Sequence, residues 1–334
     1  NVCKTLQKEL HVTSSDQRLS LLVSKNVAKT AKLYFVKTEN MVSTDEELIE
    51  VGKDTSAGHL RNISLANRLD QLCKGLKSII NSQLGASLSE ESATIIEAAI
   101  VQGDVLLDAI LSPLFTSIAT HLEKMIRYIH YEDYSSVKPP NPDADDGESC
   151  SRYISDLNTA AQHMQSKILT RLTCKDVTLP RTNKLVERLY TLFVRHVCLI
   201  SRLSEVGKMR LASDMAQLEL ALAPFDCSPS DLGDSYKALR ALRPILFTRP
   251  KDLVTNPSAT EFLPLSNVLL HMFAYAPDDL ERPHTVRGST LEQFSRWMDN
   301  NTDAKVVALI RSSLNTYADL ATVSRCGVCV CVCV

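Results

Sequence analysis

Apolar residues recur at steps of three and four along most of this chain, and this spacing limits its fold more than any other feature. The longest example is the segment 100–129. Its apolar or small positions are Ile100, Gly103, Leu107, Ile110, Leu114, Ile118, Leu122, Met125 and Ile129. Because an α-helix turns once in about 3.6 residues, these positions share one helical face. Pro113 removes a backbone donor, so we expect one long helix kinked near residues 111–112, or two helices.

The same helical spacing returns on both sides of this segment. Further helices are predicted at residues 17–42, 60–84, 153–172, 183–206, 211–222, 229–243, 265–273, 291–298 and 304–320. No segment shows a convincing strand alternation, and glycine, which turns require, is scarce at 10 of 334 residues. The chain is therefore predicted to be all-α, an elongated rod of stacked helical bundles.

Local signals predict where several of these helices end. Ser228 before Pro229 is a typical N-cap and first-turn pair, and Pro244 is expected to end the helix that follows. A Ser-x-x-Glu capping box beginning at Ser289 precedes residues 291–298. Arg210 and Asp214 stand one turn apart, on the expected polar side of helix 211–222.

Composition changes divide the chain into four parts. Residues 137–149 are rich in proline and aspartate and lack apolar periodicity, which predicts a linker. This gives a helical bundle at residues 1–136 with the long kinked helix and a second bundle at residues 150–325. The last nine residues, 326–334, alternate cysteine and valine as a TG dinucleotide repeat would encode. We interpret them as an aberrant, disordered tail.

Charge and cysteine usage exclude several classes of protein. Lys and Arg number 37 against 39 Asp and Glu, so no large field favours nucleic acid or an anionic membrane. No apolar run approaches the ~20 residues of a membrane span. The six cysteines before the tail lack Cys-x-x-Cys spacing, which is typical of a reducing compartment. Asn1 is followed by no signal peptide, so we expect a fragment of a longer protein.

Two groups of residues invite a chemical interpretation. Residues His130–Tyr134 bring an imidazole, two carboxylates and two phenols together, and the tail offers thiols at Cys326, Cys329, Cys331 and Cys333. Structural zinc normally takes two separated ligand pairs, and His196 lies on an apolar helical stripe as a core histidine would. No phosphate-binding, dinucleotide-binding, nucleophile-elbow or zincin motif is present. We therefore predict no catalytic, cofactor or metal site. The rival is a helical enzyme or small-molecule binder with a site between the two predicted bundles, near His130–Tyr134 or around His196.

One modest basic patch runs from Lys237 to Lys251. It contains Lys237, Arg240, Arg243, Arg249 and Lys251. A solvated face of an amphipathic helix is the simpler interpretation. A membrane-binding or nucleic-acid-binding module that uses this patch is the alternative function.

Six stretches, in matching order, resemble subunits of the conserved oligomeric Golgi complex, which belong to the helical-rod family of vesicle-tethering proteins. They are residues 23–30, 193–201, 207–221, 232–236, 239–247 and 294–299, and the resemblance covers roughly residues 10–320. It implies a non-catalytic scaffold that assembles with other subunits of the complex, above all subunit 7, and indirectly with trafficking proteins. It implies intra-Golgi retrograde transport at the cytosolic face of Golgi membranes, as a peripheral or cytosolic protein, with no nucleic acid and no transmembrane segment. The residues that bind partners are not assigned by it.

The resemblance also implies two differences between this chain and members of the family. Its members carry a region before the position of Asn1, and they end in a further helical segment where this chain has its Cys-Val tail. Loss of that last segment is expected to uncover an apolar groove, which puts assembly of this form in doubt.

Overall fold

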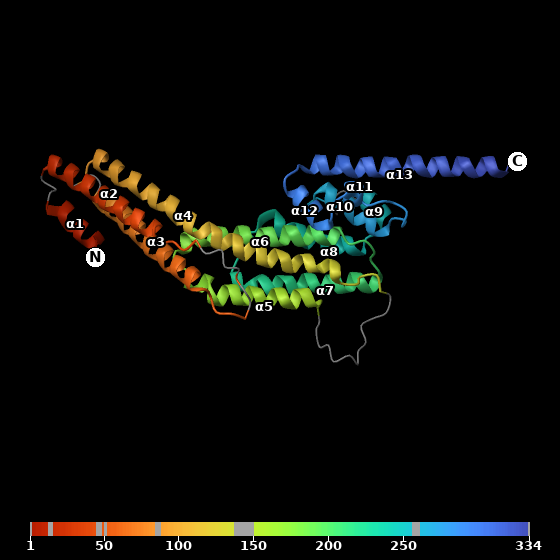
Figure 1. Cartoon of the computed structure of the whole chain (residues 1–334), viewed down its shortest axis with the longest axis horizontal. Coiled ribbons are helices and arrows are strands. Elements are labelled where there is room, and N and C mark those ends of the chain that lie inside the picture. The colour runs from red at the N-terminus through yellow and green to blue at the C-terminus, as the bar shows by residue number, and fades with distance from the viewer. Residues whose placement is uncertain are drawn as a thin grey trace. The chain divides into compact units, whose positions relative to one another are not determined.

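A computed structural model describes residues 2–12, 16–44, 49, 52–83, 88–136, 150–255 and 261–332, the last part (319–332) by its backbone alone. Within these residues every regular element is helical (Figure 1), which confirms the predicted all-α fold. The α-helices are α1 (Val2–Val12), α2 (Gln17–Glu39), α3 (Ala57–Gln83), α4 (Glu90–Arg127), α5 (Arg152–Lys167), α6 (Lys175–Cys198), α7 (Glu205–Leu222), α8 (Gly233–Phe247), α9 (Pro250–Thr255), α10 (Leu265–Met272), α11 (Pro283–Val286), α12 (Leu291–Asp299) and α13 (Asp303–Val332). Short 3-10 turns, among them η1 (Tyr128–Tyr131), extend several of them.

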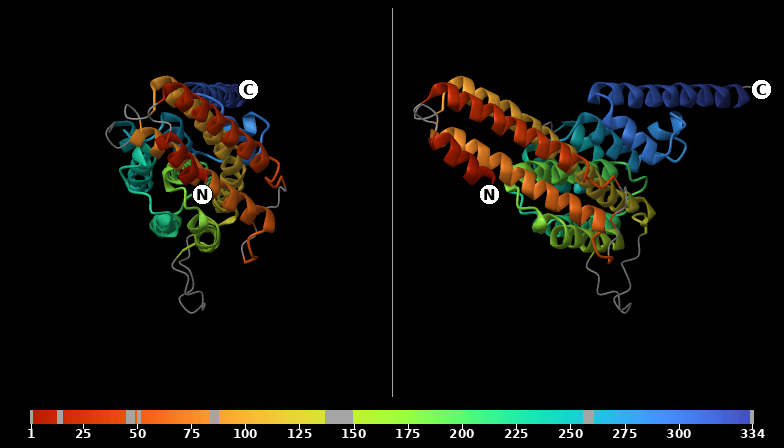
Figure 2. Two further views of the ribbon diagram at one scale, coloured as in Figure 1. Left: turned by 90° about the vertical axis from the view of Figure 1, so that its left-hand side faces the viewer. Right: turned by 60° about the vertical axis from the view of Figure 1, so that its left-hand side comes forward.

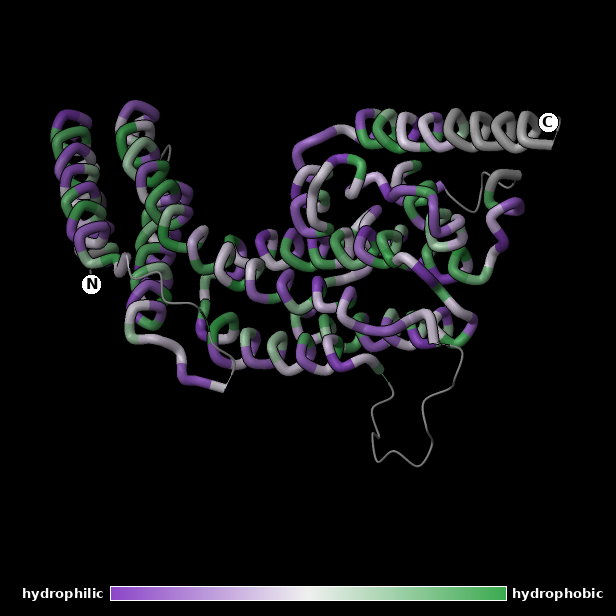
Figure 3. The backbone as a smooth tube through the Cα atoms, turned by 45° about the vertical axis from the view of Figure 1, so that its right-hand side comes forward, coloured by the Kyte–Doolittle hydropathy of each residue, from purple (hydrophilic) through white to green (hydrophobic). Residues whose placement is uncertain are grey.

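The long apolar stripe forms the buried face of α4, which continues through Pro113 as one helix. Figure 3 shows the corresponding alternation of apolar and polar residues along the helices. Leu122 and Ile129 are fully buried, as predicted. Between them, Ile126 is fully buried and the predicted Met125 is half-buried, because a step of four from Leu122 keeps closer to the buried face.

The chain forms two compact units. Unit 1 contains residues 1–121 and 163–181, and unit 2 contains residues 122–162 and 182–334. Helices α4, α5 and α6 each contribute residues to both units. Residues 137–149 lie outside the described part of the chain, so the predicted domains on either side of them stay a prediction.

Within unit 1, helices α2 and α3 and the first part of α4 lie side by side in both views of Figure 2. Gly103 permits the close packing of these helices. A Cβ atom at Gly103 would lie 2.6 Å from the Cys73 sulfur and 2.8 Å from a ring carbon of Phe35. The absence of a side chain therefore lets α4 approach α2 and α3 closely.

Within unit 2, α6 is buried on most of its circumference, as its wide apolar stripe predicted. Leu189, Phe193 and His196 are fully buried. The predicted helix 183–206 is in fact the end of α6 and the start of α7. Ser204 explains the break, because its hydroxyl accepts the Gly207 amide at 3.0 Å and caps α7.

Several predicted helix ends are wrong. The Ser228 hydroxyl accepts the Asp231 amide at 3.2 Å and so caps a turn, and α8 begins later, at Gly233. Pro244 lies inside α8 on its exposed side, where the missing hydrogen bond is tolerated. Thr290, rather than Ser289, forms the capping box of α12. Helix α13 is described as far as Val332, and the expectation of a disordered tail at residues 326–334 stays a prediction.

Candidate functional site

The residues His130–Tyr134 come together in sequence but separate in space, all within unit 2. His130 faces His196, and Tyr134 faces a different buried cluster. Glu132 forms an ion pair with Arg210, and Tyr131 is 85% exposed. These side chains therefore do not converge on one reacting position, as acid–base catalysis would require.

The imidazoles of His130 and His196 form a pair in which His196 is fully buried and His130 is partly exposed. His130 Nε2 lies 2.7 Å from His196 Nδ1. Burial lowers the pKa of His130 to about 4, helped by the nearby His284. Burial, followed by the influence of His130, also lowers the pKa of His196. Both rings are thus neutral near pH 7, where one donates its single N–H to the other.

Asp214 organises the second buried cluster. Its side chain is fully buried, which corrects the prediction that it lies on the polar side of α7. The carboxylate accepts hydrogen bonds from the hydroxyls of Ser151 at 2.7 Å, Tyr134 at 3.0 Å and Tyr153 at 3.1 Å, and from the Ser151 amide at 2.8 Å. Burial raises the pKa of both phenols, so they remain donors. The cluster thus fastens α7 to the start of α5, as a structural site would.

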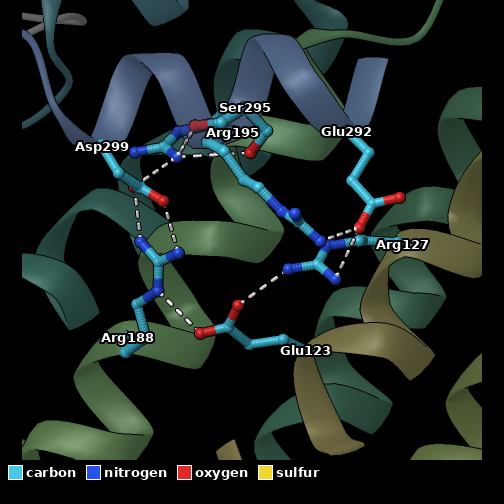
Figure 4. A network of polar contacts seen from close by, with 8 residues as sticks. Glu123, Arg127, Arg188, Arg195, Glu292, Ser295 and Asp299 are labelled. Atoms are coloured by element: carbon cyan, nitrogen blue, oxygen red, sulfur yellow. Dashed lines mark hydrogen bonds and ion pairs between the residues drawn. The ribbon is translucent and has the colours of Figure 1, made fainter. Parts of the chain in front are cut away.

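A network of arginines and carboxylates connects α4, α6 and α12 in unit 2 (Figure 4). Arg188 contacts Glu123 at 2.9 Å and Asp299 at 2.6 Å, and Arg195 contacts the same Asp299 at 2.6 Å. Arg127 extends the network to Glu123 at 3.0 Å and to Glu292 at 3.3 Å. Burial would raise the pKa of Asp299, but the hydrogen bonds from Arg188 and Arg195 lower it on balance.

Sequence reasoning missed this network, although a signal was present. Arg188 and Arg195 are seven residues apart, as are Glu292 and Asp299. Seven residues are two helical turns, so each pair shares a face. The spacing indicates the charged faces but not the pairs, since both arginines contact Asp299 and Glu292 contacts Arg127. Which helices meet is a tertiary property.

The predicted basic patch is partly neutralised by its own unit. Lys237 pairs with Asp234 at 3.0 Å, and Arg240 pairs with Glu219 at 3.2 Å. Lys237 also stands 5.5 Å from the centre of the Phe262 ring. This arrangement supports the interpretation of the patch as a solvated helical face.

Burial raises the pKa of five cysteine thiols, at Cys3, Cys73, Cys174, Cys198 and Cys227. Burial raises the pKa of Cys73 to about 11 and that of Cys198 to about 12. No metal-binding group of three His, Cys, Asp or Glu occurs within the described residues. The side chains of Cys326, Cys329, Cys331 and Cys333 lie outside that description. No helix among the described residues combines the length and the apolarity of a membrane span.

Comparison with known proteins gives a consistent result. No family model matches the chain. It is 34% identical over 317 residues to conserved oligomeric Golgi complex subunit 5 of Mus musculus, covering 95% of this chain and 38% of the mouse protein. The proteins of the same name from Arabidopsis thaliana and Drosophila melanogaster are 28% and 26% identical, over 95% and 96% of this chain and 38% and 43% of their own lengths.

The chain thus spans about two fifths of the length of the curated relatives that it matches. The resemblance covers nearly all of this chain rather than one motif. It confirms what the six short stretches indicated. Over almost its whole length, this chain resembles subunit 5 of the conserved oligomeric Golgi complex.

Proposed function

We propose that this chain is a non-catalytic scaffold segment of a subunit of the conserved oligomeric Golgi complex. It acts in vesicle tethering during intra-Golgi retrograde transport. The observation that carries this proposal is the similarity, over 95% of the chain, to relatives named as subunit 5 of that complex. Sister subunits, above all subunit 7, are its direct partners, and trafficking proteins are contacted through them.

The chemistry of the buried polar groups supports a scaffold rather than an enzyme. The groups that drew attention in the sequence, such as His130, Tyr134 and His196, are occupied in holding unit 2 together. A groove beside residues 130–134 has a volume of about 270 Å³ and is lined by Glu132 and Asp133, among others. Glu132 is paired with Arg210, and Asp133 accepts the Ser135 amide at 2.9 Å. The groove therefore offers no converging acid, base and nucleophile.

Helix faces are the means by which such a chain binds its partners. Packed amphipathic helices present ridges and grooves into which the helices of another subunit fit. On this proposal the protein works at the cytosolic face of Golgi membranes, held there through its partners.

Co-expression with the other subunits of the complex tests this proposal. The full chain should co-elute in stoichiometric amount with at least one sister subunit in size-exclusion chromatography, with subunit 7 as the first choice. Circular dichroism of the isolated chain provides the control for folding. A helical, cooperatively melting chain that co-elutes with no subunit would refute the proposed scaffold role.

A further inference from the structure

The outer face of α2 in unit 1 exposes more apolar surface than a solvated helix needs. Leu19, Leu22, Leu33 and Val36 are exposed by 49%, 58%, 57% and 53%. They lie on one side of the helix, since steps of 3, 11 and 3 residues amount to nearly whole turns. Single exposed leucines are ordinary, but a row of them along one helix indicates a binding surface.

A groove runs along the same helix. It has a volume of about 420 Å³ and is lined by Lys25, Ala28, Lys29, Lys32, Leu33 and Val36 of α2 and by Ile95 of α4. Its walls are thus apolar side chains with three lysines between them. Within the described residues, no carboxylate forms an ion pair with any of these lysines.

The opposite side of α2 packs into the core of unit 1. Val27, Ala31 and Phe35 are at most 5% exposed in the core of unit 1. The outer apolar row thus lies away from this core, so we expect substitutions in it to leave the core intact. Whatever covers the row has to come from elsewhere.

We propose that this groove, the α2 groove, binds an amphipathic helix of a partner protein whose apolar stripe is flanked by aspartate or glutamate. The apolar stripe of the partner covers Leu33, Val36 and Ile95, and its carboxylates meet Lys25, Lys29 and Lys32. The inference deepens the proposed function, on which it rests, by naming one helix face and the chemistry of its partner.

The shape of the surface favours a helix over a lipid membrane. A helix that lies in a membrane interface needs one wide, continuous apolar face with cations at its edges. Here Lys25, Lys29 and Lys32 interrupt the apolar row between Leu22 and Leu33, and the groove is concave between two helices. From Leu19 to Val36 the row is about 26 Å long, which matches about five turns of a partner helix.

A synthetic peptide serves as the probe for this groove. It is an amphipathic helix of about 20 residues, with leucine at steps of three and four and glutamate on both flanks. A twin peptide carries lysine in place of each glutamate. Fluorescence anisotropy of the labelled peptides with the full chain measures affinity, and hydrogen exchange locates the contact.

The glutamate peptide should bind and protect amides of α2 and of α4 near Ile95, whereas the lysine twin should not bind. The triple variant Lys25→Glu/Lys29→Glu/Lys32→Glu should weaken binding at least about tenfold and should allow the lysine twin to bind. Leu33→Glu should weaken binding similarly. A matched triple variant in unit 2, Lys124→Glu/Lys184→Glu/Lys305→Glu, changes the net charge equally and should bind like the parent chain. Thermal melting followed by circular dichroism checks that every variant is folded.

Three results would overturn the inference. The first is absence of peptide binding, or binding that the α2 lysines do not influence. The second is binding of anionic vesicles that depends on the same lysines while the peptide does not bind, which would make the face a membrane surface. The third is self-association of the chain that Leu33→Glu abolishes, which would make the occupant a second copy.

The inference and the proposed function fail separately. If the chain co-elutes with sister subunits and no peptide binds, the groove assignment is wrong and the scaffold role stands. If the peptide binds and no subunit co-elutes, the groove is a helix-binding surface of a chain with another role.

Discussion

The α2 groove of unit 1 and the arginine–carboxylate network of unit 2 use similar residues in opposite ways. In the network, Arg188 and Arg195 share Asp299 and are held between helices. In the groove, Lys25, Lys29 and Lys32 line an open, largely apolar surface. Removing one partner of a buried, paired charge destabilises a fold, whereas charges beside uncovered apolar side chains are available to a second molecule. The difference separates the part of the chain that builds the fold from the part that is free to bind.

Removing the shared carboxylate of the network should have the largest effect. Asp299→Ala leaves Arg188 and Arg195 without their common partner, and Arg195 is only 8% exposed. We expect a loss of about 3–4 kcal/mol in the free energy of unfolding, measured by urea denaturation. Lys29→Ala in the α2 groove should change it by less than about 0.5 kcal/mol. Equal losses for the two variants would break the comparison.

The loss of stability caused by a Gly→Ala substitution should differ between Gly207 in unit 2 and Gly103 in unit 1. A Cβ at Gly207, in unit 2, would lie 2.1 Å from the backbone oxygen of Tyr134, whereas a Cβ at Gly103 meets only side-chain atoms. A backbone carbonyl cannot move aside as a side chain can, so Gly207→Ala should destabilise by about 3 kcal/mol and Gly103→Ala by about 1. Thermal melting of both variants measures this order. The reverse order would show that the Tyr134 backbone adapts.

Acid should weaken unit 2 through its histidine pair. The pKa of His130 is lowered to about 4 in the folded state, below its ordinary value. The unfolded state therefore binds more protons, so the stabilisation by the neutral ring is complete above about pH 6.5 and is lost as the pH falls towards 4. Between pH 7 and pH 5, the parent chain should lose about 2 kcal/mol more of its free energy of unfolding than a His130→Asn variant loses. Chemical denaturation at pH 7 and pH 5 compares the two proteins, and parallel pH dependences would contradict the assignment.

Charge reversal in the basic patch at residues 237–251 should have the smallest effect, because it should not change binding. Lys237 and Arg240 already have carboxylate partners, so the patch is a weak attractor for anions. The variant Lys237→Glu/Arg240→Glu/Arg243→Glu should leave vesicle flotation and nucleic-acid binding unchanged. A salt-dependent binding that this variant abolishes would instead favour the membrane or nucleic-acid alternative.

Local sequence signals predicted helix type well and helix ends poorly. The stripe on α4 was recognisable because its spacing repeats over many turns. The breaks near Ser204 and Ser228 were misplaced because both serines are capable caps, and the surrounding packing selects which turn each one caps.

The candidate sites were likewise predicted only where the residues are adjacent in sequence. Residues 130–134 were noticed because they are adjacent in sequence, yet His130 and Tyr134 belong to different clusters. The important partners, His196 and Asp214, are 66 and 80 residues away. Asp214 in particular has the local appearance of a surface residue.

The order of amino acids alone specified an all-α chain, its main amphipathic helices and its resemblance to a Golgi complex subunit. These features depend on residues a few positions apart or on colinear similarity, so they can be recognised without coordinates. The burial of Asp214, the pairing of His130 with His196 and the exposed row on α2 depended on which helix faces pack together. Such packing joins residues far apart in the chain, and its free energy belongs to the assembled fold rather than to any local segment.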